Sequence, residues 1–339
     1  MYLKIIIIVF IFVGGIFEVQ ASDEVTWKPL KKGDKIHLFA SGFAVEASIL
    51  EKAKHVIKSY GYEPVAPDDL ITAQPFGFAN TEHYRGEHLN ELLLNSEVKV
   101  LWAVRGGRGT SAILPYLENL NSLPSLRSKV IVGFSDVTAL HLWAFSRDIP
   151  SIHGVNLTTN SEFASTVNGK TSLASVIKIL SGEDQALEYP LSPINETAQS
   201  NKSPIASKIV GGNISLIQRS IGTSTSLRPA KCVVFLEETG EVPTRFLEIM
   251  TQFKRSNLFE EVQAIILGDF IAGQSQEASR DFESLFKLFG QQMDEKHIPV
   301  FSSPLFGHGD YNEPLPFNMP ATITIEDQHK AILRIKTTS

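Results

Sequence analysis

The segment from Lys129 to Trp143, KVIVGFSDVTALHLW, predicts a strand, a sharp turn and a helix in direct succession. Its first four residues are β-prone and mostly apolar, as in a strand buried within a parallel sheet. Beyond the turn, apolar residues recur at helical spacing at Val137, Leu140 and Ala144. Such a turn lifts a serine to the C-terminal edge of a sheet, at a helix N-terminus that favours negative charge. Ser135 is therefore a candidate nucleophile; the alternative is that it only caps the helix.

Further strands and helices alternate along the rest of the chain. This alternation is typical of an α/β fold with a parallel, helix-covered sheet, whose functional site lies at the C-terminal ends of the strands. A polar, proline-containing stretch beyond residue 183 interrupts the pattern and predicts a linker, with room for an edge strand at 186–189. Buried strands are expected at 129–132, 232–236 and 264–270, with further strands at 98–104 and within 34–42, where the strand runs into a glycine-containing turn.

Charge and cysteine content exclude several classes of function. The 339 residues carry a formal net charge of -6 and give a pI near 5.9, so no basic surface for nucleic acid is expected. The single cysteine, Cys232, lies in an apolar run and is expected in the core. No Cys/His cluster has metal-ligand spacing, so we expect neither a metal nor a cofactor.

The N-terminus has the layout of a secretory signal peptide. A lysine precedes an almost wholly apolar stretch, and the small residue Ala21 offers a cleavage site, which gives a signal peptide over residues 1–21. The alternative is an uncleaved anchor, but about 13 apolar residues are short for a bilayer span of roughly 20. We therefore expect an exported protein without a stable membrane anchor.

Three other places in the chain could complete a site around a nucleophilic serine. The turn Arg105–Gly109, RGGRG, lets backbone amides approach a ligand; it could instead cradle a phosphate, although it lacks the known nucleotide-binding patterns. His308 is flanked by glycines, where an imidazole can move and remain accessible; the alternative is an incidental loop histidine. Glu237 follows a buried strand and could orient a histidine base, or it could belong to a solvated acidic loop.

Six motifs together resemble the LD-carboxypeptidase family, serine peptidases that include the microcin C self-immunity hydrolases. They occur in the order and spacing of that family and extend over essentially all of the chain after the expected leader. The motifs are RGGRG, GFSDVTALH, GGNISLI, VVFLEETGEVPTRFLEIMTQF, IILGDF and PLFGHGDYNEPLP.

The resemblance implies a Ser-Glu-His triad. Ser135 would be the nucleophile, His308 the general base and Glu237 the residue that orients the imidazole. The oxyanion would accept hydrogen bonds from the backbone N–H groups of Gly107 and Asp136. A helix N-terminus beside glycine-rich amides is chemically suited to that role.

The resemblance also implies two domains and a homodimer. The N-terminal domain, residues 22–165, would be a parallel flavodoxin-like sheet with helices on both faces and would carry the nucleophile. A linker over 166–207 would lead to a smaller C-terminal domain, residues 208–339, either α/β or β-rich, which would supply the glutamate and the histidine. The site would then form across the interface.

The expected reaction is hydrolysis of the L,D amide before the terminal D-alanine of murein tetrapeptides, through an acyl-enzyme in the periplasm. The alternatives are an immunity-type amidase for peptidyl or aminoacyl adenylate antibiotics and a non-catalytic periplasmic peptide-binding protein. Two residues depart from the family pattern, which usually has tyrosine at both places: Phe134 and Arg108. Arg108 could pair with a substrate carboxylate, because its planar fork suits that geometry, or it could lie in solvent.

Overall fold

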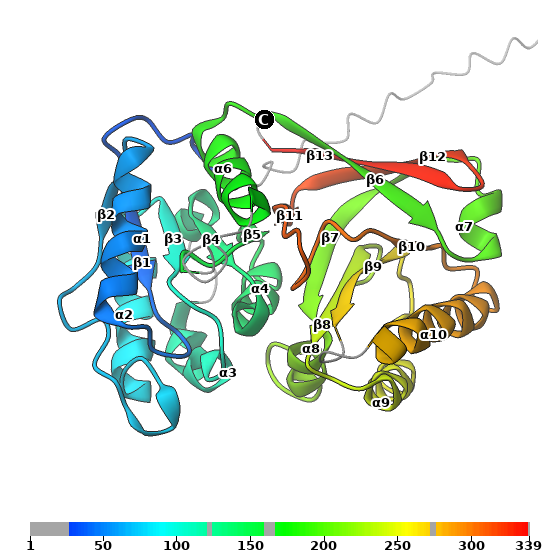
Figure 1. Cartoon of the computed structure of the whole chain (residues 1–339), viewed down its shortest axis with the longest axis horizontal. Helices are drawn as coiled ribbons and strands as arrows, with labels where there is room; N and C mark the ends of the chain where they lie inside the picture. The colour runs from blue at the N-terminus through cyan, green and yellow to red at the C-terminus, as the bar shows by residue number, and fades with distance from the viewer. Residues whose placement is uncertain (1–26, 121–123, 159–166, 272–275, 338–339) are drawn as a thin grey trace, which may run out of the picture.

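The computed structural model describes residues 27–120, 124–158, 167–271 and 276–337, and these form two halves, each built on its own sheet (Figure 1). The expected signal peptide, residues 1–21, lies outside the described residues. Within these ranges, no helix is both long and apolar enough to cross a membrane.

The first half is built on a six-stranded sheet in the order β11-β5-β4-β3-β1-β2. Strands β1 to β5 are parallel and follow the flavodoxin-like order 2-1-3-4-5, which confirms the predicted sheet. Strand β11 comes from near the end of the chain and pairs antiparallel with β5. The strands are β1 (Lys35–Phe39), β2 (Glu63–Val65), β3 (Val100–Ala103), β4 (Val130–Gly133), β5 (Ser151–His153) and β11 (Leu315–Phe317).

Helices cover both faces of this sheet (Figure 1). Successive strand residues face opposite sides, so Leu38 packs in one cluster with Ile57 of α1, whereas Phe39 packs in another with Leu89 of α2 and Leu140 of α4. The helices are α1 (Ala47–Ser59), α2 (Glu82–Leu94), α3 (Thr110–Ile113), α4 (Thr138–Phe145) and α6 (Val167–Ser181), with short 3₁₀ turns η1 (Pro75–Gly77), η2 (Leu114–Leu120), η3 (Pro124–Ser128) and η4 (Ser135–Val137).

The second half is a closed barrel in the order β10-β6-β13-β12-β7-β8-β9. The sequence left open whether this half is α/β or β-rich. The structure shows a β-barrel core with helices outside it. Pairing is parallel from β7 through β8 and β9 to β10 and antiparallel elsewhere. The strands are β6 (Ala186–Pro193), β7 (Ile205–Asn213), β8 (Val233–Thr239), β9 (Ala264–Ile271), β10 (Val300–Ser302), β12 (Pro320–Asp327) and β13 (Lys330–Lys336).

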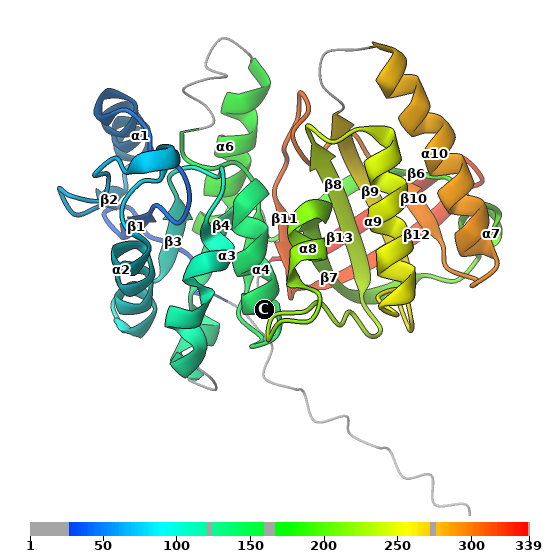
Figure 2. The ribbon, with the colours of Figure 1, turned by 90° about the horizontal axis from the view of Figure 1, so that it is seen from below.

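Two long helices lie along the outside of β8 and β9 (Figure 2). Phe246 and Phe253 of α9 and Phe289 of α10 pack against Val234 and Ile265 of these strands. This apolar layer covers the barrel face that would otherwise meet water. The helices of this half are α7 (Glu196–Ser200), α8 (Ile214–Ser220), α9 (Pro243–Arg255) and α10 (Gln276–Asp294).

The expected linker over 166–207 is instead part of both folded halves. Ile177 of α6 is buried against the first sheet, and β6 pairs with β13 on one side and β10 on the other. Exposed and buried residues alternate along β6, with Leu187, Tyr189 and Leu191 buried. The prolines of this stretch suggested a linker, but two of them lie within β6, whose apolar side chains fill the barrel. The prediction of a linker was wrong, and β6 is not an edge strand.

The two halves are joined through the helix that follows Ser135. The N–H of Asn213, at the end of β7, donates to Thr138 Oγ1 at 3.0 Å. A Cβ on Gly212 would lie 2.5 Å from the same oxygen, so only glycine permits this approach. The start of α4 is therefore fixed directly against the barrel.

Candidate active site

Ser135 occupies a strained turn between β4 and α4. Its φ is +64°, in the left-handed region, which costs a non-glycine residue about 1–2 kcal/mol. The N-cap residues are Phe134 for η4 and Val137 for α4, and neither side chain makes a capping hydrogen bond. The alternative that Ser135 serves as a helix cap is therefore not supported. Strain at a serine between strand and helix is typical of a nucleophile elbow.

A buried asparagine holds the residue before this serine. The Phe134 N–H donates to Asn156 Oδ1 at 3.2 Å, and Asn156 Nδ2 donates to the Phe134 carbonyl at 3.5 Å. Asn156 is buried and lies just beyond β5, the strand next to β4. The sequence patterns did not identify Asn156 as part of the site. Its place after a neighbouring parallel strand was the signal that could have identified it.

The glycine turn after β3 lies against Ser135. A Cβ on Gly106 would be 3.2 Å from Ser135 Cβ and 3.4 Å from its Oγ. Gly107 has a φ of +106°, and a Cβ there would lie 2.5 Å from the Phe43 ring. Gly107 leaves no room for a side chain, and a Cβ on Gly106 would be tight against Ser135, so the backbone of this turn lies close to the serine, as an oxyanion site requires.

The side chain of Asp136 ties the glycine turn to the serine turn. It is buried and accepts hydrogen bonds from Thr110 N at 2.9 Å and Thr110 Oγ1 at 2.7 Å. Burial raises the pKa of Asp136, against the opposing effect of the two Thr110 bonds. Arg85, also buried, donates to the carbonyls of Ser41 and Gly109. The sequence suggested a role for the backbone N–H of Asp136 but not for its side chain. The partner of that side chain, Thr110, lies in a different connection between a strand and a helix.

His308 and Glu237 are in direct contact. His308 Nδ1 lies 2.6 Å from Glu237 Oε2, and Glu237 is fully buried near the end of β8. A carboxylate only accepts hydrogen bonds, so Nδ1 carries the proton and donates it, which leaves Nε2 free to act as a base. The alternatives of a solvated acidic loop and an incidental loop histidine are both inconsistent with this arrangement.

The glycines beside His308 permit close packing. A Cβ on Gly307 would be 3.3 Å from Glu237 Cβ, and one on Gly309 would be 2.1 Å from Asp269 Oδ2. The imidazole is only 16% exposed. The glycines therefore bring the loop of His308 against two acidic side chains, Glu237 and Asp269.

The charge around His308 favours its protonated form. Burial lowers the pKa of His308, but the charge and hydrogen bond of Glu237, with the charges of Glu238 and Asp269, outweigh burial and hold this pKa above its ordinary value. Glu238 is itself buried and accepts from Asn213 Nδ2 at 2.7 Å. Burial raises the pKa of Glu238 as well.

Phe134 brings the two halves of the site together. Its ring centroid lies 4.7 Å from that of His308, so the histidine of the second half packs on the residue that precedes Ser135. Behind Phe134, the His153 ring lies at 5.9 Å. Burial, with smaller contributions from His141 and His308, holds the pKa of His153 far below its ordinary value. An uncharged imidazole therefore lies behind the site.

The other predicted residues have simpler surroundings. Arg108 is exposed in the glycine turn, and Cys232 is buried, as predicted for the latter. Across the described ranges, no group of His, Cys, Asp or Glu side chains is arranged to hold a metal ion.

Comparisons with known proteins cover both halves of the chain. Residues 35–154 match a model of the LD-carboxypeptidase N-terminal domain, and residues 206–323 match a model of the LD-carboxypeptidase C-terminal domain. A putative carboxypeptidase of Rickettsia conorii is 30% identical over 266 residues, which are 77% of this chain and 79% of that protein. The murein tetrapeptide carboxypeptidase of Pseudomonas aeruginosa is 26% identical over 311 residues, 90% of this chain and 97% of that protein.

Solved structures share the fold at lower identity. The muramoyltetrapeptide carboxypeptidase of Oxalobacter formigenes superposes with a TM-score of 0.73 at 21% identity, covering 90% of this chain and 100% of that one. An MccF-like protein of Bacillus anthracis gives a TM-score of 0.74 at 18% identity, covering 92% of this chain and 99% of that one. Both likenesses include the parallel sheet and the barrel.

Proposed function

The chain belongs to the LD-carboxypeptidase family, and from this premise we propose that it hydrolyses the L,D amide before the terminal D-alanine of murein tetrapeptides, with Ser135 as nucleophile. The observation that carries the proposal is the Glu237–His308 hydrogen bond beside the strained turn of Ser135. A buried carboxylate on one imidazole nitrogen, next to an elbow serine, is the arrangement that activates a hydroxyl for acyl transfer.

The substrate class rests on the relatives. The murein tetrapeptide carboxypeptidase of Pseudomonas aeruginosa aligns along 90% of this chain, and a probable murein peptide carboxypeptidase of Bacillus subtilis along 72%. Their names support a murein peptide as substrate. Arg108, exposed in the turn next to Gly107, would pair with a carboxylate of that peptide.

Acylation would begin with attack of Ser135 Oγ on the carbonyl carbon of the L,D amide. His308 Nε2 takes the hydroxyl proton, and Glu237 stabilises the imidazolium that forms. When the tetrahedral intermediate collapses, the C–N bond breaks and the imidazolium gives its proton to the leaving amine of D-alanine. The peptide remains attached to Ser135 as an ester.

The negative oxygen of the intermediate would be held by the backbone N–H groups of Gly107 and Asp136. Removing one such donor typically lowers the rate by roughly 10²- to 10³-fold. Water then attacks the ester with His308 as base, which releases the tripeptide and restores Ser135. No step of this route requires a metal or a cofactor.

The proposal also includes export to the periplasm and assembly as a homodimer. Export follows from the signal-peptide pattern at residues 1–21 and would place the enzyme beside its polymer. The homodimer follows from the family resemblance. Cell fractionation and sedimentation of the purified protein test the two points separately.

The decisive test is to incubate the purified protein with murein tetrapeptide and to measure tripeptide and free D-alanine by mass spectrometry. We expect release by the wild type, no release by Ser135→Ala, and no cleavage of the same peptide ending in L-alanine. Cleavage of an aminoacyl sulfamoyl adenosine in place of the tetrapeptide would indicate an immunity-type amidase. Peptide binding by the wild type without any release would indicate a binding protein and refute the proposal.

A further inference from the structure

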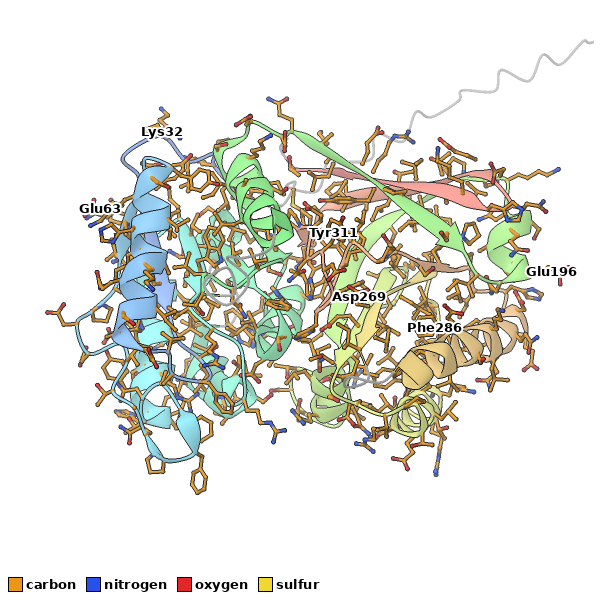
Figure 3. The ribbon with its side chains drawn as sticks, viewed as in Figure 1. Lys32, Glu63, Glu196, Asp269, Phe286 and Tyr311 are labelled. Atoms are coloured by element: carbon orange, nitrogen blue, oxygen red, sulfur yellow. The ribbon has the colours of Figure 1, made fainter. Side chains whose placement is uncertain are left out.

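Asp269 lies near the end of β9, next to the strand that carries Glu237, and near the centre of the molecule in Figure 3. The pairing register between β8 and β9 shifts at this point, with one extra residue on β9. Leu267 and Phe270 consequently face the same cluster outside the barrel, where regular alternation would place them on opposite faces. This bulge turns Asp269 to the same side as Glu237, a use of bulges found next to active sites.

From this position Asp269 holds the loop of His308 on both sides of the histidine. Its backbone N–H donates to the Phe306 carbonyl at 2.9 Å, and its Oδ2 accepts from Gly309 N at 3.1 Å. Gly309 can approach this closely only because it has no Cβ. The loop is thereby fixed at Phe306, before His308, and at Gly309, directly after it.

The imidazole of His308 therefore lies among acidic groups from two adjacent strands and from its own loop, with an uncharged imidazole behind it. The hydrogen bond to Glu237 fixes the ring itself, whereas Asp269 fixes the backbone from which the ring projects. The other titratable groups around the pair of His308 and Asp269 are Glu237 and Glu238 of β8, Asp310 of the loop and His153 of β5.

We propose that Asp269 is a positioning residue of this site: its carboxylate fixes the loop that carries His308 and places a second negative charge near the imidazole. The inference rests on the proposed function, in which His308 acts as the base. Glu237 alone would orient the ring, but a ring on a free glycine-flanked loop would spend less time in line with Ser135. Asp269 removes that freedom.

The protonation of Asp269 connects this role to pH. Burial raises the pKa of Asp269 to about 7; the Gly309 bond lowers it, the charges of Glu237 and Asp310 raise it, and His308 lowers it. Because each of the two groups shifts the pKa of the other, the titrations of Asp269 and His308 are coupled, and the observed steps belong to the pair. Charged Asp269 favours the imidazolium, so its removal should allow His308 to lose its proton at lower pH.

The test compares Asp269→Asn and Asp269→Ala in the full-length protein. Asparagine keeps the size and an oxygen that accepts from Gly309 N–H, but it carries no charge. We expect Asp269→Asn to lower the His308 pKa by roughly 0.5 to 1 unit, measured by NMR on ¹³C-labelled histidine. The acid limb of the kcat/KM profile should move by the same amount. Asp269→Ala also releases the loop, and its kcat should fall roughly tenfold below that of Asp269→Asn.

Asp310→Asn is the matched control, because Asp310 is exposed on the same loop and leaves the Gly309 bond in place. It should shift the His308 pKa by less than half as much as Asp269→Asn. An unchanged His308 pKa in Asp269→Asn, or a shift equal to that of the control, overturns the inference; thermal melts establish that the variants are folded. The NMR titration needs no substrate. If the wild type released no D-alanine and Asp269→Asn still shifted the His308 pKa, the role of Asp269 would stand and the proposed function would fall.

Discussion

His308 Nδ1 lies 2.6 Å from Glu237 Oε2, although 71 positions separate the two residues in the chain. Glu237 comes from a strand of the barrel and His308 from a loop held against that strand by glycines. Because Phe134 packs on the same imidazole, this pair also fixes where the second half of the molecule meets Ser135.

Glu237→Gln should lower kcat roughly 10⁴-fold, as expected when a triad carboxylate loses its charge and the histidine its correct tautomer. The measurement is D-alanine release under saturating murein tetrapeptide. Glu241→Gln is a suitable control, because Glu241 lies beyond the same strand and accepts a hydrogen bond from Ser215 Oγ at 3.4 Å, not from His308. A loss of less than about tenfold in Glu237→Gln would show that this carboxylate does not orient the base.

Ser135→Ala and Ser135→Gly should both abolish turnover, since neither has a nucleophile. They should differ in stability, because the φ of +64° strains alanine but not glycine. We expect Ser135→Gly to have the higher free energy of unfolding by about 1 kcal/mol, measured by urea denaturation. Equal stabilities would mean that the turn is not strained in solution, and residual turnover above a few per cent would remove Ser135 from the mechanism.

Gly107→Ala should lower kcat by roughly 10²- to 10³-fold, because the new methyl group meets the Phe43 ring and displaces the N–H that we propose as an oxyanion donor. Gly222→Ala provides the control: Gly222 also has a positive φ, +86°, but a Cβ there meets nothing within 4 Å. Both variants should lose stability from backbone strain, and only Gly107→Ala should lose activity. Comparable kinetic losses in the two variants would argue against an oxyanion role for the turn.

The acid limb of the kcat/KM profile should have its midpoint above pH 6.5, the ordinary pKa of histidine. His308 must be neutral to accept the Ser135 proton, and the net effect of its surroundings is to raise its pKa. As pH falls through that raised value the base becomes protonated, so activity declines on the acid side and not on the alkaline side. Initial rates between pH 5 and 9 at low substrate concentration measure this limb. A midpoint below 6.5 would contradict the electrostatic description of the site.

The strand–turn–helix around Ser135 could be predicted from local sequence, because buried strands and amphipathic helices leave periodic patterns in neighbouring residues. The prolines of β6 show the limit of that approach. They indicate a linker locally, but Leu187, Tyr189 and Leu191 belong to a strand, because β13 pairs with it on one side and β10 on the other. The flavodoxin-like order of the first sheet and the triad assignment came from the family resemblance.

The residues that support the site were not predictable in this way. Asn156 holds Phe134, the Asp136 side chain holds Thr110, and Asp269 holds the loop of His308. Each of these contacts joins segments that are distant in sequence, and an isolated Asn or Asp leaves no periodic pattern. Only the pairing of parallel strands, with their C-terminal ends at one edge, identifies such partners.

The sequence by itself determined the alternation of strands and helices, the turn at Ser135 and, through six motifs, the family. The tertiary structure decided that the stretch read as a linker completes a barrel, that the glycines beside His308 pack its loop against Glu237 and Asp269, and that the Asp136 side chain ties the glycine turn to the turn of Ser135. The physical reason is that backbone propensity and apolar periodicity are properties of neighbouring residues, whereas burial, close approach and charge depend on what the rest of the chain brings to the same place.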